Sequence, residues 1–348
     1  MRTDHVDALD LEIVDALQRD PRAGWTSVGT MVDRSPVSVA RRWNRMSRAH
    51  LAWTGIALHP AASQGAFIEV SCSHANLSHV IENLSRYPDI ITVGTTTGDF
   101  NLYCILIGVS LPGILRRINE DIIELRLCER TRINLFHQIT GGVDWRQEIV
   151  GTTTSARDAP PPSEVMEEFQ NLHQSTRGVT QAPSASFRPL FLALGADARR
   201  PLNQLAEELG STTSTVKRMV TQLQSRRQAI FRCDVARPLF DYPISTILSL
   251  RTPPEFAEEL AFRIGGLKET RFCASVASTA NVIVVAGLRS LLDGENFTSR
   301  IALMGIPAEI ASRSISMRMA KVYGRILDNR GRSRLHIPVD PWAAEVHP

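Results

Sequence analysis

The feature that most constrains this chain is an internal repeat. Shifting the 348-residue sequence by 177 positions superimposes residues 13–46 on residues 190–223 without a gap. Only six of the 34 aligned pairs are identical, but the apolar positions coincide, as in Ile13 with Leu190 and Trp43 with Val220. Self-similarity over such a length indicates one folding unit that is used twice.

Each copy begins with helical patterns and continues as alternating strands and helices. In the first copy, helices are expected near 8–19 and 25–32, and a third begins at Ser35-Pro36. The following segments are a strand at 66–72, a helix at 76–86, strands at 90–96 and 100–109, a helix at 111–125 and a strand at 128–137. The second copy matches with strand 244–251, helix 254–264, strands 268–276 and 281–289, helix 291–304 and strand 308–321. We therefore predict an α+β fold: a tandem duplication of a winged or three-helix helix-turn-helix domain followed by a ferredoxin-like βαββαβ domain.

Composition sets the expected boundaries between these units. The stretch 151–186 is rich in Thr, Ser, Gln and Pro and contains one short helical candidate at 163–173, which is typical of a linker. The predicted organisation is helix-turn-helix 1–58, ferredoxin-like domain 63–140, linker 141–186, helix-turn-helix 187–240, ferredoxin-like domain 241–325 and irregular tail 326–348.

The third helix of the first copy has the pattern of a DNA-recognition helix. Val39, Trp43 and Met46 form its buried stripe, and the first basic side chain of the opposite face is Arg41. No acid occurs between residues 35 and 54, although the formal net charge of the whole chain is only +3. Because arginine can bind guanine or phosphate bidentately, this face suits a major groove. The expected DNA-binding residues are Ser35, Ser38, Arg41, Arg42, Arg45 and Arg48 in the first copy, and Thr215, Lys217 and Arg218 in the second.

The run from Leu9 to Met46, followed by the βαββαβ pattern, resembles the Lrp/AsnC (feast/famine) transcriptional regulators. Two such units in tandem would cover nearly the whole chain except the linker and tail. The resemblance implies a DNA-binding helix-turn-helix and a ferredoxin-like (RAM/ACT-like) domain that dimerises through its sheet and senses a small molecule such as an amino acid. It places the effector near a Gly-x-x-Asp turn, which here reads Gly98, Asp99, Phe100 and Asn101, and which in the second copy ends at Asn281. Since an asparagine cannot supply the charge of the final acid, we expect a different effector or the loss of one or both sites.

An enzyme and a ligand sensor are the two alternatives to a regulator. No histidine or cysteine spacing suits a metal, and no phosphate-loop or nucleophile motif occurs, so we expect no metal, no cofactor and no catalytic residue. Siroheme decarboxylases also resemble tandem Lrp/AsnC units and use histidine and arginine around this hairpin. Because residues 95–100 and 275–280 hold neither, the sequence predicts that the protein is not an enzyme. The other alternative is a ligand sensor whose second helix-turn-helix has lost DNA binding.

The expected partners are double-stranded DNA and a small-molecule effector. The absence of an apolar leader and of any long apolar run favours a cytoplasmic protein without a membrane partner. The sheets are expected to pair either between two chains, as a homo-oligomer, or within one chain, as an intramolecular pseudo-dimer.

Overall fold

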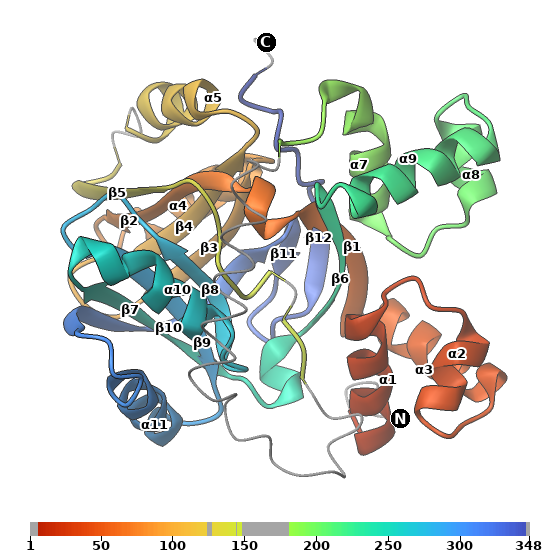
Figure 1. Ribbon diagram of the computed structural model, residues 1–348, viewed down its shortest axis with the longest axis horizontal. Coiled ribbons are helices and arrows are strands. Elements are labelled where there is room, and N and C mark those ends of the chain that lie inside the picture. Colours follow the sequence, from red (N-terminus) through yellow and green to blue (C-terminus); the bar gives the residue numbers. More distant parts are fainter. Residues whose placement is uncertain (1–5, 124–126, 144, 148–180, 346–348) are drawn as a thin grey trace.

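The computed structural model describes residues 6–123, 127–143, 145–147 and 181–345. The first helix-turn-helix unit contains α1 (Ala8–Arg19), α2 (Trp25–Met31) and α3 (Pro36–Arg48). The second contains the short η3 (Ala185–Phe187), α7 (Arg188–Ala196), α8 (Leu202–Glu208) and α9 (Thr213–Ser225). Figure 1 shows the two units on the same side of the sheet. The predicted helix at 163–173 lies outside the described residues.

Each helix-turn-helix unit is followed by one strand, and these two strands pair with each other. β1 (Ala52–Leu58) runs antiparallel to β6 (Ala229–Val235), with Gly55 opposite Arg232. These two residues are also the ones that the 177-residue shift superimposes, so a pseudo-two-fold axis passes between them. The helix-turn-helix units therefore have the three-helix form and not the winged form. The strand that follows each unit makes its backbone hydrogen bonds with the equivalent strand of the other copy, not with a second strand of its own unit.

The two ferredoxin-like domains follow the predicted order of elements. The first contains β2 (Gln64–Ser71), α4 (Leu77–Arg86), β3 (Ile90–Thr96), β4 (Leu102–Gly108), α5 (Leu111–Arg116) with the π-helical η2 (Arg117–Ile122), and β5 (Arg130–Phe136). The second contains β7 (Ile244–Arg251), α10 (Ala257–Gly265), β8 (Thr270–Ser275), β9 (Val282–Leu288), α11 (Leu291–Ala302) and β10 (Glu309–Val322). Short 3-10 turns η1 (Pro60–Ala62), η4 (Arg237–Phe240) and η5 (Pro254–Phe256) connect these elements.

The two four-stranded sheets join into one surface that closes on itself. The strand order is β5-β2-β4-β3-β10-β7-β9-β8, with β3 and β10 forming the junction. The two outer strands then meet through isolated bridges of Leu135 with Ala277 and of Gly141 with Cys273. At the junction the amide of Thr97 donates to the carbonyl of Ile315 at 2.9 Å, and at the closing seam the amide of Ala277 donates to the carbonyl of Leu135 at 2.8 Å. These equivalent bonds show that one chain forms a pseudo-dimer.

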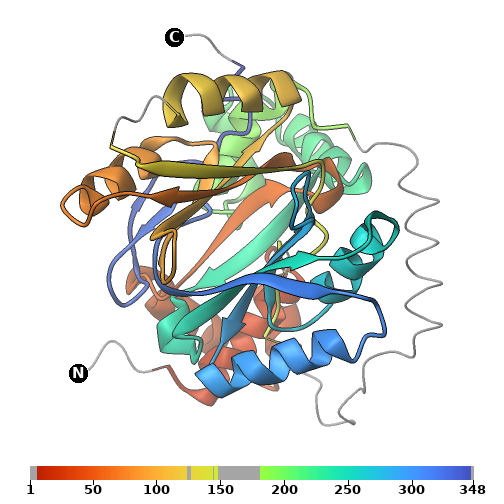
Figure 2. The same ribbon diagram turned by 90° about the vertical axis from the view of Figure 1, so that its left-hand side faces the viewer.

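Aromatic side chains fill the space between the inner faces of the sheet. Phe67 stacks on Tyr103 with ring centroids 5.3 Å apart and contacts Phe272 at 5.7 Å, so the two copies share one core. The outer faces are covered by helices, and Figure 2 shows α5 and α11 on opposite sides of the strands.

The two helix-turn-helix units also hold each other directly. The Arg22 guanidinium donates to the carbonyls of Ala198 and Arg200. The Arg199 guanidinium donates to the carbonyls of Pro21 and Ala23, at 2.8 and 2.9 Å. Since the 177-residue shift superimposes Arg22 on Arg199, this reciprocal contact, the arginine clasp, obeys the same pseudo-two-fold symmetry.

The C-terminal segment is more regular than the sequence predicts. β11 (Arg325–Leu327) pairs with β10, and β12 (Ser333–His336) pairs with β11. Further along, Asp340 accepts both Nε and Nη2 of Arg188 at 2.9 and 2.6 Å. The expectation of an irregular tail is therefore wrong for this hairpin, because β10 continues beyond the residues that pair with β7, and β11 pairs with Lys321 and Val322 along that edge.

Candidate DNA-binding surface and ligand cleft

Helix α3 is held by features that are visible in the sequence. The Ser35 hydroxyl accepts the amide of Ser38 at 3.3 Å as the N-cap, and Pro36 occupies the first helical position. Val39, Trp43 and Met46 are buried against α1 and α2. The opposite side of α3 is consequently fixed toward solvent.

The exposed side of α3 differs from the predicted one by a small rotation. Arg42 pairs with Asp7 at 2.7 Å and with Asp10 at 3.1 Å, and Arg45 pairs with Asp10. Although burial acts to raise it, the Arg42 hydrogen bond lowers the pKa of Asp7 below its usual value. Arg42 and Arg45 therefore face α1 in this structure, and their DNA contacts stay a prediction.

Beyond Pro36, the residues that remain exposed along α3 form a single stripe, which we call the α3 face. It consists of Val37, Arg41, Asn44 and Arg48. Val37 is 79% exposed. The i, i+4, i+7, i+11 spacing of the α3 face places two arginines and an amide on one line along the helix. Such a line suits insertion into a major groove.

The second unit presents a weaker version of this surface. Thr212 caps α9 by accepting the Thr215 amide at 3.2 Å, and its hydroxyl donates to Thr215 Oγ1 at 2.9 Å. Lys217 and Arg218 are exposed. Threonine and serine occupy the positions of Asn44 and Arg48, since Thr221 and Ser225 are their counterparts in the repeat. The two recognition helices are thus unequal.

The hairpins expected to hold the effector open into one shared cleft of about 650 Å³, the hairpin cleft. Both copies contribute: Glu69, Thr97, Gly98, Asp99, Phe100, Arg132 and Asn134 from the first, and Ser249, Arg251, Ser278, Thr279, Ala280, Ala311, Ser312, Arg313 and Ser314 from the second. Gly98 adopts a φ of +95°, a left-handed conformation that glycine accepts readily. The sequence suggested one site at each hairpin, whereas the structure joins the two hairpins in one cavity.

Asn101 and Asn281 have a structural role that the sequence did not reveal. The Asn101 side chain accepts the amide of Cys72 at 3.1 Å and donates to its carbonyl at 2.7 Å. Asn281 makes the same pair of bonds with Thr252, at 3.0 and 2.9 Å. Each amide group fixes the end of a neighbouring strand, so an effector contact by either residue stays a prediction.

Three arginines give the hairpin cleft a positive lining. Arg132 pairs with Glu69 at 3.3 Å and lies over the Phe100 ring, while Arg251 and Arg313 pair with exposed glutamates outside the cleft. They come from β5, β7 and β10, not from the hairpins. Sequence inspection of the hairpins alone therefore missed them.

The described part of the chain contains neither a metal-binding cluster nor a helix suited to crossing a membrane. No three His, Cys, Asp or Glu side chains within the described ranges are arranged to hold a metal ion. No described helix is both long and apolar enough to span a bilayer.

Comparison with known proteins supports the predicted class. Residues 6–47 match the family model of the AsnC-type helix-turn-helix domain. An uncharacterized HTH-type transcriptional regulator of Pyrococcus horikoshii is 22% identical over 138 residues, which cover 38% of this chain and 87% of that protein. The chain thus carries an AsnC-type helix-turn-helix domain, and its resemblance to Lrp/AsnC regulators is confirmed.

The fold of nearly the whole chain is also found in an enzyme. The siroheme decarboxylase NirDL, solved in co-complex with an iron-uroporphyrin III analogue, aligns with a TM-score of 0.54 at 13% identity, covering 89% of this chain and 92% of that one. A second NirDL structure aligns with the same TM-score at 12% identity, over 91% and 93% of the two chains. The expectation that this protein is not an enzyme is therefore overturned. It rested on the hairpin residues, whereas the arginines of the cleft come from adjacent strands.

Proposed function

We propose that this protein is a DNA-binding transcriptional regulator that reads its operator mainly through α3. The α3 face carries this proposal: two exposed arginines and an asparagine lie along the recognition helix of an AsnC-type helix-turn-helix. Because α9 lacks the counterparts of Asn44 and Arg48, the second unit contributes phosphate contacts more than base readout. One chain would then recognise an asymmetric site.

Replacing Arg41 by alanine is expected to weaken specific DNA binding by about 1–3 kcal/mol, roughly 5- to 150-fold, because a bidentate contact to guanine is lost. The matched control is Arg86→Ala, which removes an exposed arginine of α4 that pairs with Glu82. Fluorescence anisotropy with a selected genomic fragment measures both variants. Equal affinity of Arg41→Ala and the unchanged protein would remove Arg41 from the DNA interface.

A second candidate function, binding or decarboxylation of a tetrapyrrole carboxylate, is favoured by the hairpin cleft. Its volume lies within the range of organic-ligand sites, and Arg132, Arg251 and Arg313 are suited to carboxylates. The NirDL structure solved with an iron-uroporphyrin III analogue shares this fold. The cleft would therefore take a polycarboxylate as an effector or as a substrate.

Titration with iron-uroporphyrin III, followed by its visible absorbance, tests this second candidate. We expect a saturable spectral shift that the Arg251→Gln, Arg313→Gln double variant weakens at least tenfold, because two charge-assisted contacts are lost. Incubation with siroheme and measurement of released CO₂ then separates a substrate from an effector. An unchanged spectrum at every ratio would exclude the tetrapyrrole assignment without affecting DNA binding.

A further inference from the structure

Among the described residues of the second copy, Arg232 and Arg271 are buried and Arg237 is half-buried. Arg232 lies on β6, Arg237 begins η4, and Arg271 lies on β8. Asp234 is already engaged by Arg232 in a bidentate pair, at 2.7 Å from Nε and 2.6 Å from Nη2. Arg232 also donates Nη1 to the Val143 carbonyl at 2.9 Å, so each nitrogen of its guanidinium has a hydrogen-bond partner.

Arg271 and Arg237 remain without an acidic partner among the described residues. Arg271 is stacked on Trp145 at 3.5 Å and donates Nη1 to backbone carbonyls, but its Nε and Nη2 are buried without a hydrogen bond. Burial lowers the pKa of Arg237, with the nearby Asp234 charge opposing it. Within the described ranges the Arg237 guanidinium has neither a hydrogen bond nor an ion pair. A half-buried guanidinium without such partners is stabilised when an anion lies against it.

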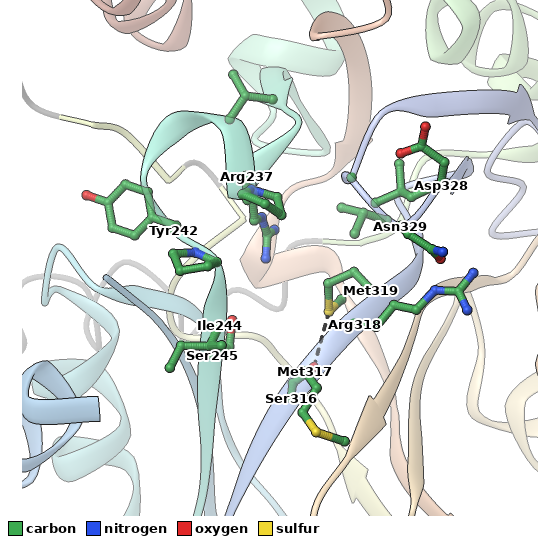
Figure 3. A pocket seen from close by; sticks show the side chains of 16 residues that line it. Arg237, Tyr242, Ile244, Ser245, Ser316, Met317, Arg318, Met319, Asp328 and Asn329 are labelled. Atoms are coloured by element: carbon green, nitrogen blue, oxygen red, sulfur yellow. Dashed lines mark hydrogen bonds between the residues drawn. The ribbon is translucent and has the colours of Figure 1, made fainter. Parts of the chain in front are cut away.

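Arg237 opens into a small cavity of about 50 Å³, the Arg237 pocket. In Figure 3 its side chain extends from η4 into the space between Tyr242 and Met319. The pocket lies between η4, the start of β7, and β10 with the β11 turn, and its walls combine Ile244, Met319 and Leu327 with the hydroxyl of Ser245. The pocket has room for several water molecules, and it combines the Arg237 cation with apolar walls. These features suit a short organic anion.

The charges around the pocket favour an anion without an ammonium group. Asp328 is the acid of the lining, and its Oδ1 accepts the amides of Arg330 and Arg332 at 2.8 and 3.0 Å. Its Oδ2 lies 4.0 Å from Arg334 Nε, so both carboxylate oxygens already have partners. Arg318 adds a second, exposed cation at the rim.

We propose that the Arg237 pocket binds a small monocarboxylate, with its carboxylate on the Arg237 guanidinium and its short hydrocarbon chain against Ile244, Met319 and Leu327. The site belongs to the second copy alone, because Pro60 of η1 stands where Arg237 stands in the repeat. It is separate from the hairpin cleft, since the two cavities share no lining residue. The proposal does not depend on the DNA-binding or tetrapyrrole assignments.

Thermal unfolding and calorimetric titration of the full chain with sodium butyrate test this proposal. Butyrate is expected to raise the unfolding temperature in a saturable manner, because a ligand that binds only the folded state stabilises it. Butyramide, which has the same shape without the charge, should give no shift. Arg237→Met should weaken butyrate binding by about tenfold to a hundredfold and also raise the unfolding temperature of the free protein, since an unpaired charge is removed.

The matched control is Arg86→Met, which removes an exposed arginine of α4 that pairs with Glu82, and neither residue belongs to the pocket lining. This variant should bind butyrate like the unchanged protein. If Arg237→Met does not fold, Arg237→Gln replaces it in the same titration. The proposal is overturned if butyrate gives no shift, if butyramide or inorganic phosphate acts equally well, or if the Arg237 variants keep their response.

Discussion

Replacing Gly141 by alanine should destabilise the protein by about 3–5 kcal/mol, in the range reserved for severe packing defects. A Cβ at this position would lie 2.3 Å from the Gly265 carbonyl oxygen and 2.4 Å from its Cα, both backbone atoms at the end of α10. Gly141 also pairs with Cys273 where the sheet closes. The seam must therefore open, or α10 must move, to admit a single methyl group.

The control for this substitution is Gly195→Ala in α7. A Cβ there would meet nothing within 4 Å. Alanine should therefore stabilise that helix by roughly 0.5–1 kcal/mol through its lower conformational entropy in the unfolded chain. Urea denaturation measures both variants. A Gly141→Ala protein as stable as the unchanged one would mean that the closing seam does not form.

Replacing Arg199 by alanine should cost about 2–3 kcal/mol, because the carbonyls of Pro21 and Ala23 lose a charged donor. The arginine also lies 3.9 Å over the Trp25 ring, so its removal exposes part of the first helix-turn-helix. Burial lowers the pKa of Arg199 while the Asp197 charge opposes this effect. The arginine clasp is thus a half-buried contact between the two copies.

Arg200→Ala is the matched control for the clasp. The Arg200 side chain pairs with Glu208 at the surface, while its backbone carbonyl accepts Arg22 and is unaffected by the substitution. Its loss should change the free energy of unfolding by less than about 1 kcal/mol. If Arg199→Ala and Arg200→Ala unfold at the same urea concentration, the clasp contributes nothing to stability.

The sequence predicted the repeat and most elements because local patterns determine them. Ser35-Pro36 marks the start of α3, and Val39, Trp43 and Met46 specify its buried side. Such local patterns do not predict which residues far apart in the sequence will contact each other. Asp7 and Asp10 look like ordinary helix-start acids, yet they take Arg42 and Arg45 away from the exposed side of α3.

The sequence contains one signal of the arginine clasp. Asp20 with Arg22, and Asp197 with Arg199, are identical in both copies although neither pair belongs to the buried stripe of a helix. Identity at such positions in a divergent repeat indicates a contact that both copies need, and the arginine clasp is that contact. The cleft arginines had no comparable signal, since three strands far apart in the sequence bring them together.

The most direct test of the account is selection of genomic fragments by the purified full chain, repeated over a series of salt concentrations. We expect enrichment of a few asymmetric sites, affinity that falls steeply as salt rises, and loss of this enrichment in Arg41→Ala. Uniform weak binding, or the same sites recovered with Arg41→Ala, would contradict DNA reading through α3.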